Sequence, residues 1–166
     1  MTISATIPGF VIRAAAESDV PVILSFIKKL AAYEKLTHEV VATETLLRET
    51  LFGSLRTAEV AIGYCEGKPV GFVLFFHNYS TFLGRPGLYI EDLFVDQAHR
   101  RRGFGRALLL YVAQLAKERR CGRLEWSVLD WNEPAVNFYR KLGAVAMNEW
   151  TVFRVTGASL TNLAEA

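Results

Sequence analysis

The spacing of apolar residues divides the start of the chain into a strand and a helix. Residues 10–13 are rich in β-formers, and the polar pair Ser18 and Asp19 follows them. Apolar residues then recur at helical spacing, at Ile23, Phe26, Ile27, Leu30 and Ala31. The pattern predicts a helix that Ser18 and Asp19 cap and that ends near Leu36.

A second helix and a β-hairpin are expected next. Thr43 is a good N-cap for a shorter, weaker helix through residue 51. Residues 58–65 and 70–77 then flank the turn sequence Glu66-Gly67-Lys68-Pro69. Two β-forming runs around so short a turn predict a pair of antiparallel strands.

Two carboxylates interrupt the strand that we expect after a loop with Gly84, Pro86 and Gly87. Residues 88–95 form an apolar run too short for a buried helix, yet Glu91 and Asp92 lie inside it. Consecutive strand residues face opposite sides of a sheet, so one of the two carboxylates should line a cleft. The alternative is an edge strand, or a β-bulge that turns both carboxylates to solvent.

A loop rich in arginine and glycine follows this strand and leads into a helix. Residues 99–106 read His-Arg-Arg-Arg-Gly-Phe-Gly-Arg, and residues 107–116 are strong helix formers. Glycines let backbone amides turn toward a ligand, and the following helix offers its positive dipole end and its unpaired N–H groups. The segment therefore predicts a binding site for a phosphate-bearing ligand.

Other interpretations of this loop fit less well. A dinucleotide-binding fold would need a third glycine or alanine where Leu108 stands, and a P-loop would need its lysine and hydroxyl. A plain basic patch for nucleic acid has no need of glycines at this spacing after a strand.

Composition narrows the class of protein. The chain has 166 residues, of which 51% are hydrophobic, so we expect a single globular domain over residues 1–166. A net charge of +2 predicts no nucleic-acid or membrane partner, and no apolar run is long enough to span a bilayer. Cys65 and Cys121 lack zinc-finger spacing and no histidine has an informative partner, so we expect a cytoplasmic protein without a metal site.

Two motifs in this order resemble the GNAT superfamily of N-acetyltransferases. Arg100-x-x-Gly103-x-Gly105, after the strand residues 89–95, is similar to motif A of that superfamily, which binds acetyl-CoA. Residues 131–144 resemble its N-x-x-A-x-x-F-Y-x-x-x-G segment. Stretches at 12–15, 30–34, 89–92 and 131–134 extend the resemblance over nearly the whole chain, to the spermidine/spermine, diamine and thialysine acetyltransferase branch.

The resemblance implies which residues hold acetyl-CoA as the co-substrate. It implies that the strand backbone pairs with the pantetheine arm at Leu93, Phe94 and Val95. It implies that the loop surrounds the pyrophosphate with Arg101, Arg102, Gly103, Phe104, Gly105 and Arg106, and that Arg100 also belongs to the cofactor-binding residues. The start of a later helix would also approach the cofactor, with Asn132, Glu133, Pro134 and Ala135, while Tyr139 would stand beside the thioester sulfur.

Tyr139 is the residue that we expect to act as general acid. Aminolysis of a thioester expels a thiolate, and a phenol of pKa about 10 can protonate the thiolate of a thiol whose pKa is about 8.5 or above. The alternative, from the residues alone, is an amphipathic helix that uses Phe138 and Tyr139 as core side chains.

The acceptor amine needs an acidic site. An ammonium of pKa about 10.4 loses its proton at a cost of roughly 4 kcal/mol at neutral pH, so a base or a water path has to assist. In this branch Glu91 is the catalytic candidate, by binding the cation and ordering a relay water. The expected acceptor side is acidic and aromatic, formed by Tyr33, Glu34, Glu91, Asp92, Glu125, Trp126 and Ser127. Alternatively, Tyr33 and Glu34 only finish the first helix at its exposed side.

The fold implied by the resemblance is α/β of mixed α+β type, with a GNAT-like twisted, mostly antiparallel sheet and helices on both faces. A V-shaped split between the strands at 88–95 and 123–129 would admit pantetheine, Gly143 would stop the last helix, and a strand at 151–155 would complete the sheet. Members of this branch are usually homodimers that share C-terminal strands, so we expect a homodimer with Val152, Phe153 and Val155 in the contact.

The expected function is transfer of the acetyl group of acetyl-CoA to the primary amine of a polyamine, a diamine or a lysine-like amino acid. A protein or peptide amine acetyltransferase and a non-catalytic CoA-binding module are the alternatives.

Overall fold

The computed structural model describes residues 7–166, which divide into two compact units. The first unit, Met1–Ser127, holds the β-sheet, and the second, Val128–Ala166, holds two helices. The strands are β1 (Phe10–Ala14), β2 (Glu59–Cys65), β3 (Lys68–Ser80), β4 (Arg85–Val95) and β5 (Leu124–Trp126).

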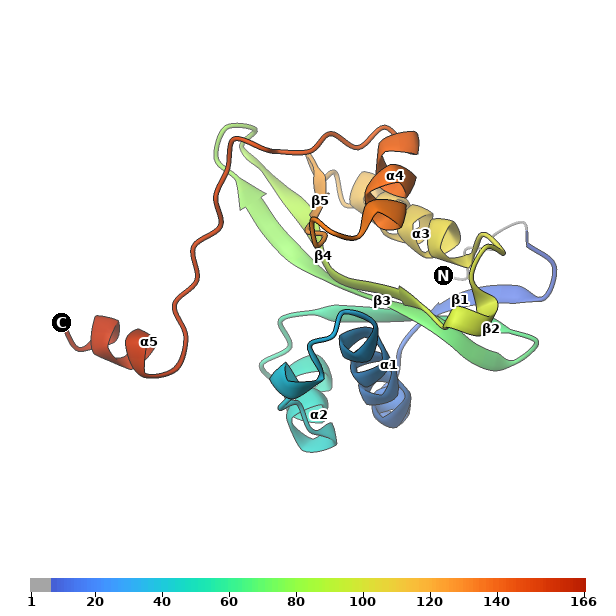
Figure 1. Cartoon of the computed structure of the whole chain (residues 1–166), viewed down its shortest axis with the longest axis horizontal. Helices are drawn as coiled ribbons and strands as arrows, with labels where there is room; N and C mark the ends of the chain where they lie inside the picture. The colour runs from blue at the N-terminus through green and yellow to red at the C-terminus, as the bar shows by residue number, and fades with distance from the viewer. Residues whose placement is uncertain (1–6) are drawn as a thin grey trace. The chain divides into compact units, whose positions relative to one another are not determined.

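The sheet has the strand order β1-β2-β3-β4-β5 (Figure 1). The first four strands pair antiparallel, whereas β4 and β5 pair in parallel over three residues only, from Leu88↔Leu124 to Ile90↔Trp126. β4 then continues to Val95 without a β5 partner among the described residues, because β5 ends at Trp126. The mostly antiparallel sheet and the split between these strands confirm the expected fold, although β5 is shorter than the strand expected at 123–129.

Helices cover both faces of the sheet in the first unit (Figure 1). α1 (Val20–Tyr33) and α2 (Glu44–Phe52) lie on one face, where the rings of Phe26 and Phe72 stack with centroids 5.6 Å apart. α3 (Phe104–Glu118) lies on the other face, where the ring of Phe104 stacks on Phe10 at 4.2 Å. Each fully buried side chain of this size contributes about 1.5–3 kcal/mol, so packing on both faces stabilises the sheet.

Both ends of α1 differ in detail from the expectation. Asp19 is the N-cap residue, but its carboxylate accepts a hydrogen bond from the Ala16 amide at 2.9 Å and none from the helix. The helix ends at Tyr33 rather than near Leu36, because Lys35 adopts a left-handed conformation with φ 61. The short 3-10 turns η1 (Glu17–Asp19), η2 (Thr37–Glu39) and η3 (Gln97–His99) link the larger elements.

The second helix and the hairpin agree with the sequence. The Thr43 hydroxyl accepts the Leu46 amide at 3.2 Å, which is the expected cap of α2. The hairpin turn contains only Glu66 and Gly67, since both adopt positive φ and β3 already begins at Lys68. β4 begins at Arg85, so most of the loop expected around residues 84–87 belongs to the strand instead.

The second unit contains α4 (Glu133–Lys141) and α5 (Gly157–Ala164). Gly143, with φ 88, lies just beyond α4 and is the expected glycine stop. The strand expected at residues 151–155 is wrong: this segment has no regular secondary structure, and Phe153 is 90% exposed. β-formers become a strand only when a partner accepts their backbone hydrogen bonds, and no described strand pairs with this segment.

Across residues 7–166, no helix has both the length and the apolar character that crossing a bilayer requires.

Candidate active site

The loop between β4 and α3 has the backbone of an anion-binding turn. Arg101 and Gly103 both adopt positive φ, at 62 and 83 degrees, which turns successive amides toward one side. Gly103 is the N-cap of α3 and supplies no side-chain cap, and the helix ladder starts with the bond from the Ala107 amide to the Gly103 carbonyl at 3.0 Å. The amides of the first turn therefore face outward from the helix end, ready for an anionic ligand.

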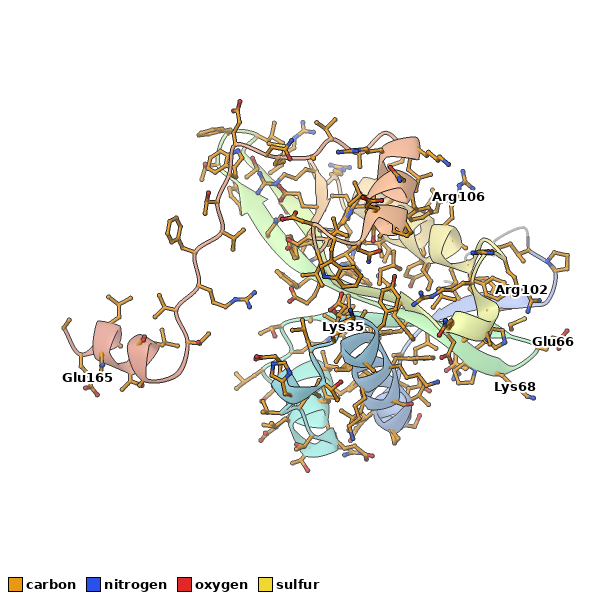
Figure 2. All side chains as sticks on the ribbon, in the orientation of Figure 1. Lys35, Glu66, Lys68, Arg102, Arg106 and Glu165 are labelled. Atoms are coloured by element: carbon orange, nitrogen blue, oxygen red, sulfur yellow. The ribbon has the colours of Figure 1, made fainter. Side chains whose placement is uncertain are left out.

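Three arginines of the loop are exposed, and one aromatic residue is not. Arg101, Arg102 and Arg106 are solvent-exposed, and Figure 2 labels Arg102 and Arg106. A hollow of about 370 Å³ opens beside the loop, lined by Gln97, Arg100 and Arg101. The ring of Phe104 is buried in the core, so of the expected loop residues this one offers a ligand only its backbone amide. Arg102 contacts the protein although it is exposed: its guanidinium donates to the Cys65 Sγ at 3.7 Å and lies 4.9 Å from the centroid of the Phe104 ring.

Arg100 is less exposed than Arg101, Arg102 and Arg106, and its side chain contacts the end of β4 and the end of α1. Its Nε donates a hydrogen bond to the Val95 carbonyl at 3.1 Å. Its guanidinium carbon lies 4.2 Å from the centroid of the Tyr33 ring and 5.7 Å from that of Phe94. The structure thus brings Arg100 together with Tyr33, which we had expected on the acceptor side.

The end of β4 presents an open strand edge. Leu93, Phe94 and Val95 pair with β3 on one side, while β5 has already ended on the other. The Phe94 side chain is buried in the core between α1 and the sheet, so these residues can offer a ligand mainly their backbone groups. This is the backbone edge that the sequence motif led us to expect for the pantetheine arm.

A β-bulge separates the two carboxylates of β4. Leu74 pairs with Asp92 but Phe75 pairs with Ile90, so Glu91 is the extra residue. Glu91 is exposed, whereas Asp92 lies largely buried. The bulge was the alternative expected from the sequence, but it turns only one of the two carboxylates to solvent, and Asp92 is the one that faces inward.

Asp92 and its neighbours form an acidic cluster, which we define as Glu34, Glu91 and Asp92. Burial, with the charges of Glu91 and Glu34 as smaller causes, raises the pKa of the Asp92 carboxyl to about 6. Burial also raises the pKa of Glu34 at the end of α1. No cation among the described residues offsets the effect at Asp92, so the cluster is a place where a bound ammonium would be stabilised.

The residues expected on β5 are already engaged within the sheet. Glu125 accepts a hydrogen bond from Asn78 at 2.7 Å and lies 2.8 Å from the Arg123 guanidinium. The hydroxyl of Ser127 hydrogen-bonds that of Tyr89 at 2.6 Å. Trp126 is half-buried and forms the last pair with β4.

Sequence reasoning missed the partners of these β5 residues. Asn78 and Glu125 are 47 residues apart, and Tyr89 and Ser127 are 38 apart. Alternation along β4 places Tyr89 on the face opposite Ile90, but only the register of β4 against β5 reveals its partner.

In the second unit the start of α4 is fixed by its cap. The Asn132 side chain accepts the Ala135 amide at 3.4 Å, and Pro134 occupies the first turn beside Glu133. Asn132 is buried. Tyr139 lies on the same helix, and its ring centroid is 5.2 Å from that of Phe138.

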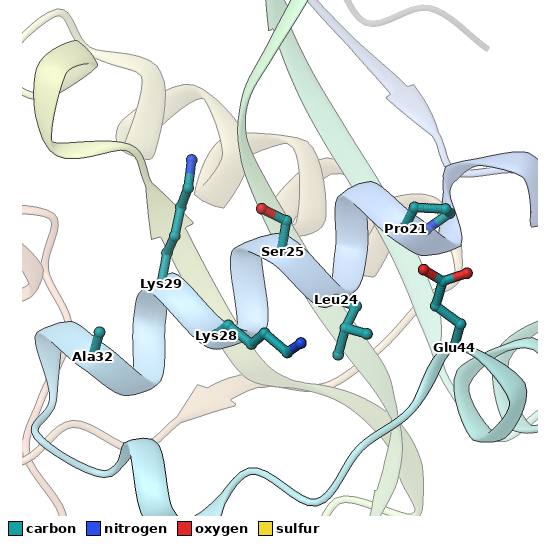
Figure 3. Close-up of a pocket in the computed structure, with 7 residues that line it drawn as sticks. All are labelled: Pro21, Leu24, Ser25, Lys28, Lys29, Ala32 and Glu44. Carbon is teal, nitrogen blue, oxygen red and sulfur yellow. The ribbon is translucent and has the colours of Figure 1, made fainter.

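A second hollow lies along the outer side of α1 (Figure 3). It measures about 450 Å³ and is lined by Pro21, Leu24, Ser25, Lys28, Lys29, Ala32 and Glu44. Although it is larger than the hollow beside the loop, it includes no carboxylate of the acidic cluster and no residue of the arginine loop. We therefore take the loop, the open edge of β4 and the acidic cluster as the candidate site.

Comparison with known proteins assigns the class of enzyme. The model of the acetyltransferase (GNAT) family matches residues 29–144, a range that includes the acidic cluster, the loop and α4. The chain belongs to the GNAT acetyltransferase family and is an acetyl-CoA-dependent N-acetyltransferase.

Relatives of this chain place it more closely within the family. It is 38% identical to the thialysine N-epsilon-acetyltransferase of Mus musculus, over 92% of this chain and 96% of that protein. It is 37% identical to the L-ornithine N5-acetyltransferase of Arabidopsis thaliana, over 90% of this chain and 85% of that protein. The expected resemblance to the diamine and thialysine branch is confirmed.

Solved structures share the fold. An integron cassette protein from Vibrio cholerae superposes with a TM-score of 0.81 at 23% identity, covering 95% of this chain and 99% of that one. An aminoglycoside acetyltransferase from a soil metagenomic sample, in complex with sisomicin, gives a TM-score of 0.75 at 22% identity, covering 89% and 96%.

Alanine variants of Gly103 and Gly67 can separate an effect on acetyl-CoA binding by the loop from an effect on the stability of the protein. Both glycines adopt left-handed φ, at 83 and 76 degrees, so alanine at either position should cost about 1 kcal/mol of unfolding free energy. Only Gly103→Ala changes the amides at the start of α3, so only this variant should weaken acetyl-CoA binding in calorimetry. Equal weakening in Gly67→Ala, at the hairpin tip, would mean that the loss is one of general stability.

Proposed function

We propose that this enzyme transfers the acetyl group of acetyl-CoA to the primary amine of a small cationic acceptor: a polyamine, a diamine or a lysine-like amino acid. The observation that carries the proposal is the acidic cluster, in which Asp92 is largely buried beside two further carboxylates without an offsetting cation. A cationic acceptor supplies the missing positive charge. The relatives that act on thialysine and ornithine, both amino acids with a side-chain amine, support the same choice.

The residues of the loop and of β4 fit acetyl-CoA. The first-turn amides of α3, with Arg101, Arg102 and Arg106 around them, would hold the pyrophosphate, because amides and guanidinium groups both donate to phosphate oxygens. The open backbone edge at Leu93–Val95 would pair with the amides of the pantetheine arm. In the same proposal Asn132 to Ala135, at the start of α4, approach the cofactor.

The two units would then act as one domain. The family model spans residues 29–144 without a break, so it covers most of the first unit and the helix α4 of the second. This continuity supports a single acetyltransferase domain over residues 1–166.

In the proposed reaction the acceptor nitrogen forms a bond to the thioester carbonyl carbon and the carbon–sulfur bond breaks. Asp92 and Glu34 hold the acceptor as an ammonium, and Glu91, which is exposed to water, orders the water that takes the ammonium proton before attack. Tyr139 donates its hydroxyl proton to the departing thiolate sulfur, and the proton that the attacking nitrogen loses as the amide forms restores the Tyr139 hydroxyl group. Acetyl-CoA supplies only the activated acyl group.

The assembly and the compartment belong to the proposal as well. Val152 and Phe153 are 81% and 90% exposed and leave apolar surface uncovered, which supports a homodimer through the C-terminal segment. The free thiols of Cys65 and Cys121 support a reducing, cytoplasmic location.

The test is CoA release from acetyl-CoA with a panel of acceptors. The panel contains spermidine, putrescine, diaminopropane, thialysine, ornithine, lysine and a lysine-containing peptide. The fully N-acetylated form of each acceptor is the control that lacks a reacting amine. We expect turnover of at least one small diamine or amino acid and little with the peptide. Turnover of the peptide alone would replace the proposal by a protein acetyltransferase, and binding of acetyl-CoA without any turnover would indicate a CoA-binding module.

A further inference from the structure

Two basic side chains, Lys29 of α1 and Arg100 of the segment after β4, connect the C-terminal half of α1 to that segment. Lys29 Nζ lies 3.0 and 2.8 Å from the two carboxylate oxygens of Asp96. Figure 3 shows the Lys29 side chain leaving α1 in a different direction from that of Lys28. One turn further along the helix, the guanidinium of Arg100 covers the ring of Tyr33 at 4.2 Å. Both anchors join the helix that carries Glu34 to the end of the strand that carries Asp92.

The Arg100 side chain contacts three residues: Val95, Tyr33 and Phe94. The Nε hydrogen bond to Val95 fixes the guanidinium against the end of β4, and the rings of Tyr33 and Phe94 lie within cation–π distance. Arg101 and Arg106 are exposed by comparison. The planar guanidinium suits such a position because it donates in its plane while stacking on aromatic faces.

We propose that Arg100 is a positioning residue for the amine acceptor, which holds the end of α1 so that Glu34 stays beside Asp92, and that it does not serve chiefly as a phosphate ligand. The inference rests on the proposed function, because it assigns the acceptor to the acidic cluster. It reassigns Arg100 from the group of residues that the sequence motif implied for the cofactor.

The local backbone explains how the effect would reach Glu34. Glu34 follows Tyr33 directly, and its amide bonds the Leu30 carbonyl at 2.9 Å. The helix then closes through the left-handed Lys35, whose φ is 61. Because Glu34 is the next residue in this turn, a contact that holds Tyr33 in place also holds the backbone from which the Glu34 side chain extends.

The experiment compares Arg100→Ala with Arg101→Ala, its neighbour in the same loop. We expect Arg100→Ala to raise KM for the amine by about fivefold or more, the effect of losing one cation–π contact. Arg101→Ala should raise KM for acetyl-CoA and leave KM for the amine nearly unchanged. Arg100→Lys keeps the charge but not the planar stacking, so it should resemble Arg100→Ala. An Arg100→Ala enzyme altered only in KM for acetyl-CoA would overturn the inference.

A double-mutant cycle tests the contact itself. If Arg100 acts through the Tyr33 ring, then Tyr33→Leu, Arg100→Ala and the double variant should have similar values of KM for the amine. Multiplicative effects would contradict the inference, since they would show that the two residues act independently. A loss of stability shared by both variants would not by itself produce this pattern in KM at a temperature where all are folded.

The role of Arg100 can be tested even if the proposed function is wrong. If the unmodified enzyme turns over no amine, calorimetric binding of acetyl-CoA still compares the two arginines. Under our inference Arg100→Ala weakens that binding less than Arg101→Ala does, and equal weakening would assign Arg100 to the cofactor after all.

Discussion

Replacing Tyr139 by phenylalanine is expected to lower kcat by about a hundredfold or more, which is the size of a typical general-acid contribution. The substitution keeps the aromatic ring and its contact with Phe138 on α4, and it removes only the hydroxyl group. KM for acetyl-CoA should change by less than about twofold, because a group that acts on the leaving sulfur contributes to the transition state rather than to ground-state binding. Steady-state kinetics at saturating amine measures both quantities.

Tyr79→Phe provides the matched control for this prediction. Tyr79 lies near the end of β3 and is 61% exposed, outside the candidate site, so loss of its hydroxyl should leave kcat unchanged. The melting temperature of each variant separates a catalytic loss from a folding defect. A Tyr139→Phe enzyme with unchanged kcat would remove the general-acid role and leave the thiolate to be protonated by water.

Asp92→Asn is expected to stabilise the protein and at the same time to weaken binding of the acceptor amine. The pKa of Asp92 is raised from 3.8 to about 6, so the folded state binds more protons than the unfolded state between these values. The free energy of unfolding of the unmodified protein should therefore fall as the pH rises from about 4 to about 6, and it should stay lower above that range. Asparagine removes this cost, so we expect a gain of about 3 kcal/mol at pH 7.5 and a flatter profile, measured by urea unfolding across pH.

The same substitution should raise KM for the amine by about tenfold or more, because a charge-assisted hydrogen bond is lost. KM for the amine in the unmodified enzyme should also fall as the pH rises through about 6, where Asp92 becomes ionised. Glu91→Gln is the paired control for stability: its carboxylate is exposed, so we expect the unfolding free energy to change by less than about 0.5 kcal/mol. Stability that is unchanged in Asp92→Asn would mean that this carboxylate is hydrated rather than buried.

The elements of the first unit could be predicted because local signals determine them. The cap at Thr43, the turn at Glu66 and Gly67 and the helical spacing from Ile23 to Ala31 all depend on residues close in the sequence. The loop before α3 could also be recognised, since its glycines and its place between a strand and a helix are visible in the chain itself.

The direction of individual side chains in the site could not be predicted. Arg100 and Arg101 are adjacent and chemically identical, yet one turns inward and the other is exposed, because the backbone reverses at Arg101 with φ 62. The bulge at Glu91 depends on how β3 pairs with β4, and a sequence pattern with period two has no signal for one inserted residue.

At residues 151–155 the sequence instead predicted an element that the structure does not contain. The β-forming residues of this segment give a clear strand signal, but a strand also needs a partner backbone, and that requirement does not appear in the sequence of the segment itself.

Because the edge of β4 is unpaired, the free energy of unfolding of this protein should depend on binding of its co-substrate. Beyond Ile90, backbone donors and acceptors of β4 lack a neighbouring strand on the β5 side among the described residues. A ligand that pairs with this edge, as the pantetheine arm does in the proposed function, acts as an added strand that only the native state can bind. At a concentration of a hundred times Kd, such a ligand stabilises the fold by about 2.7 kcal/mol through mass action alone. The lifetime of this enzyme against proteolysis would then follow the acetyl-CoA level of the cell.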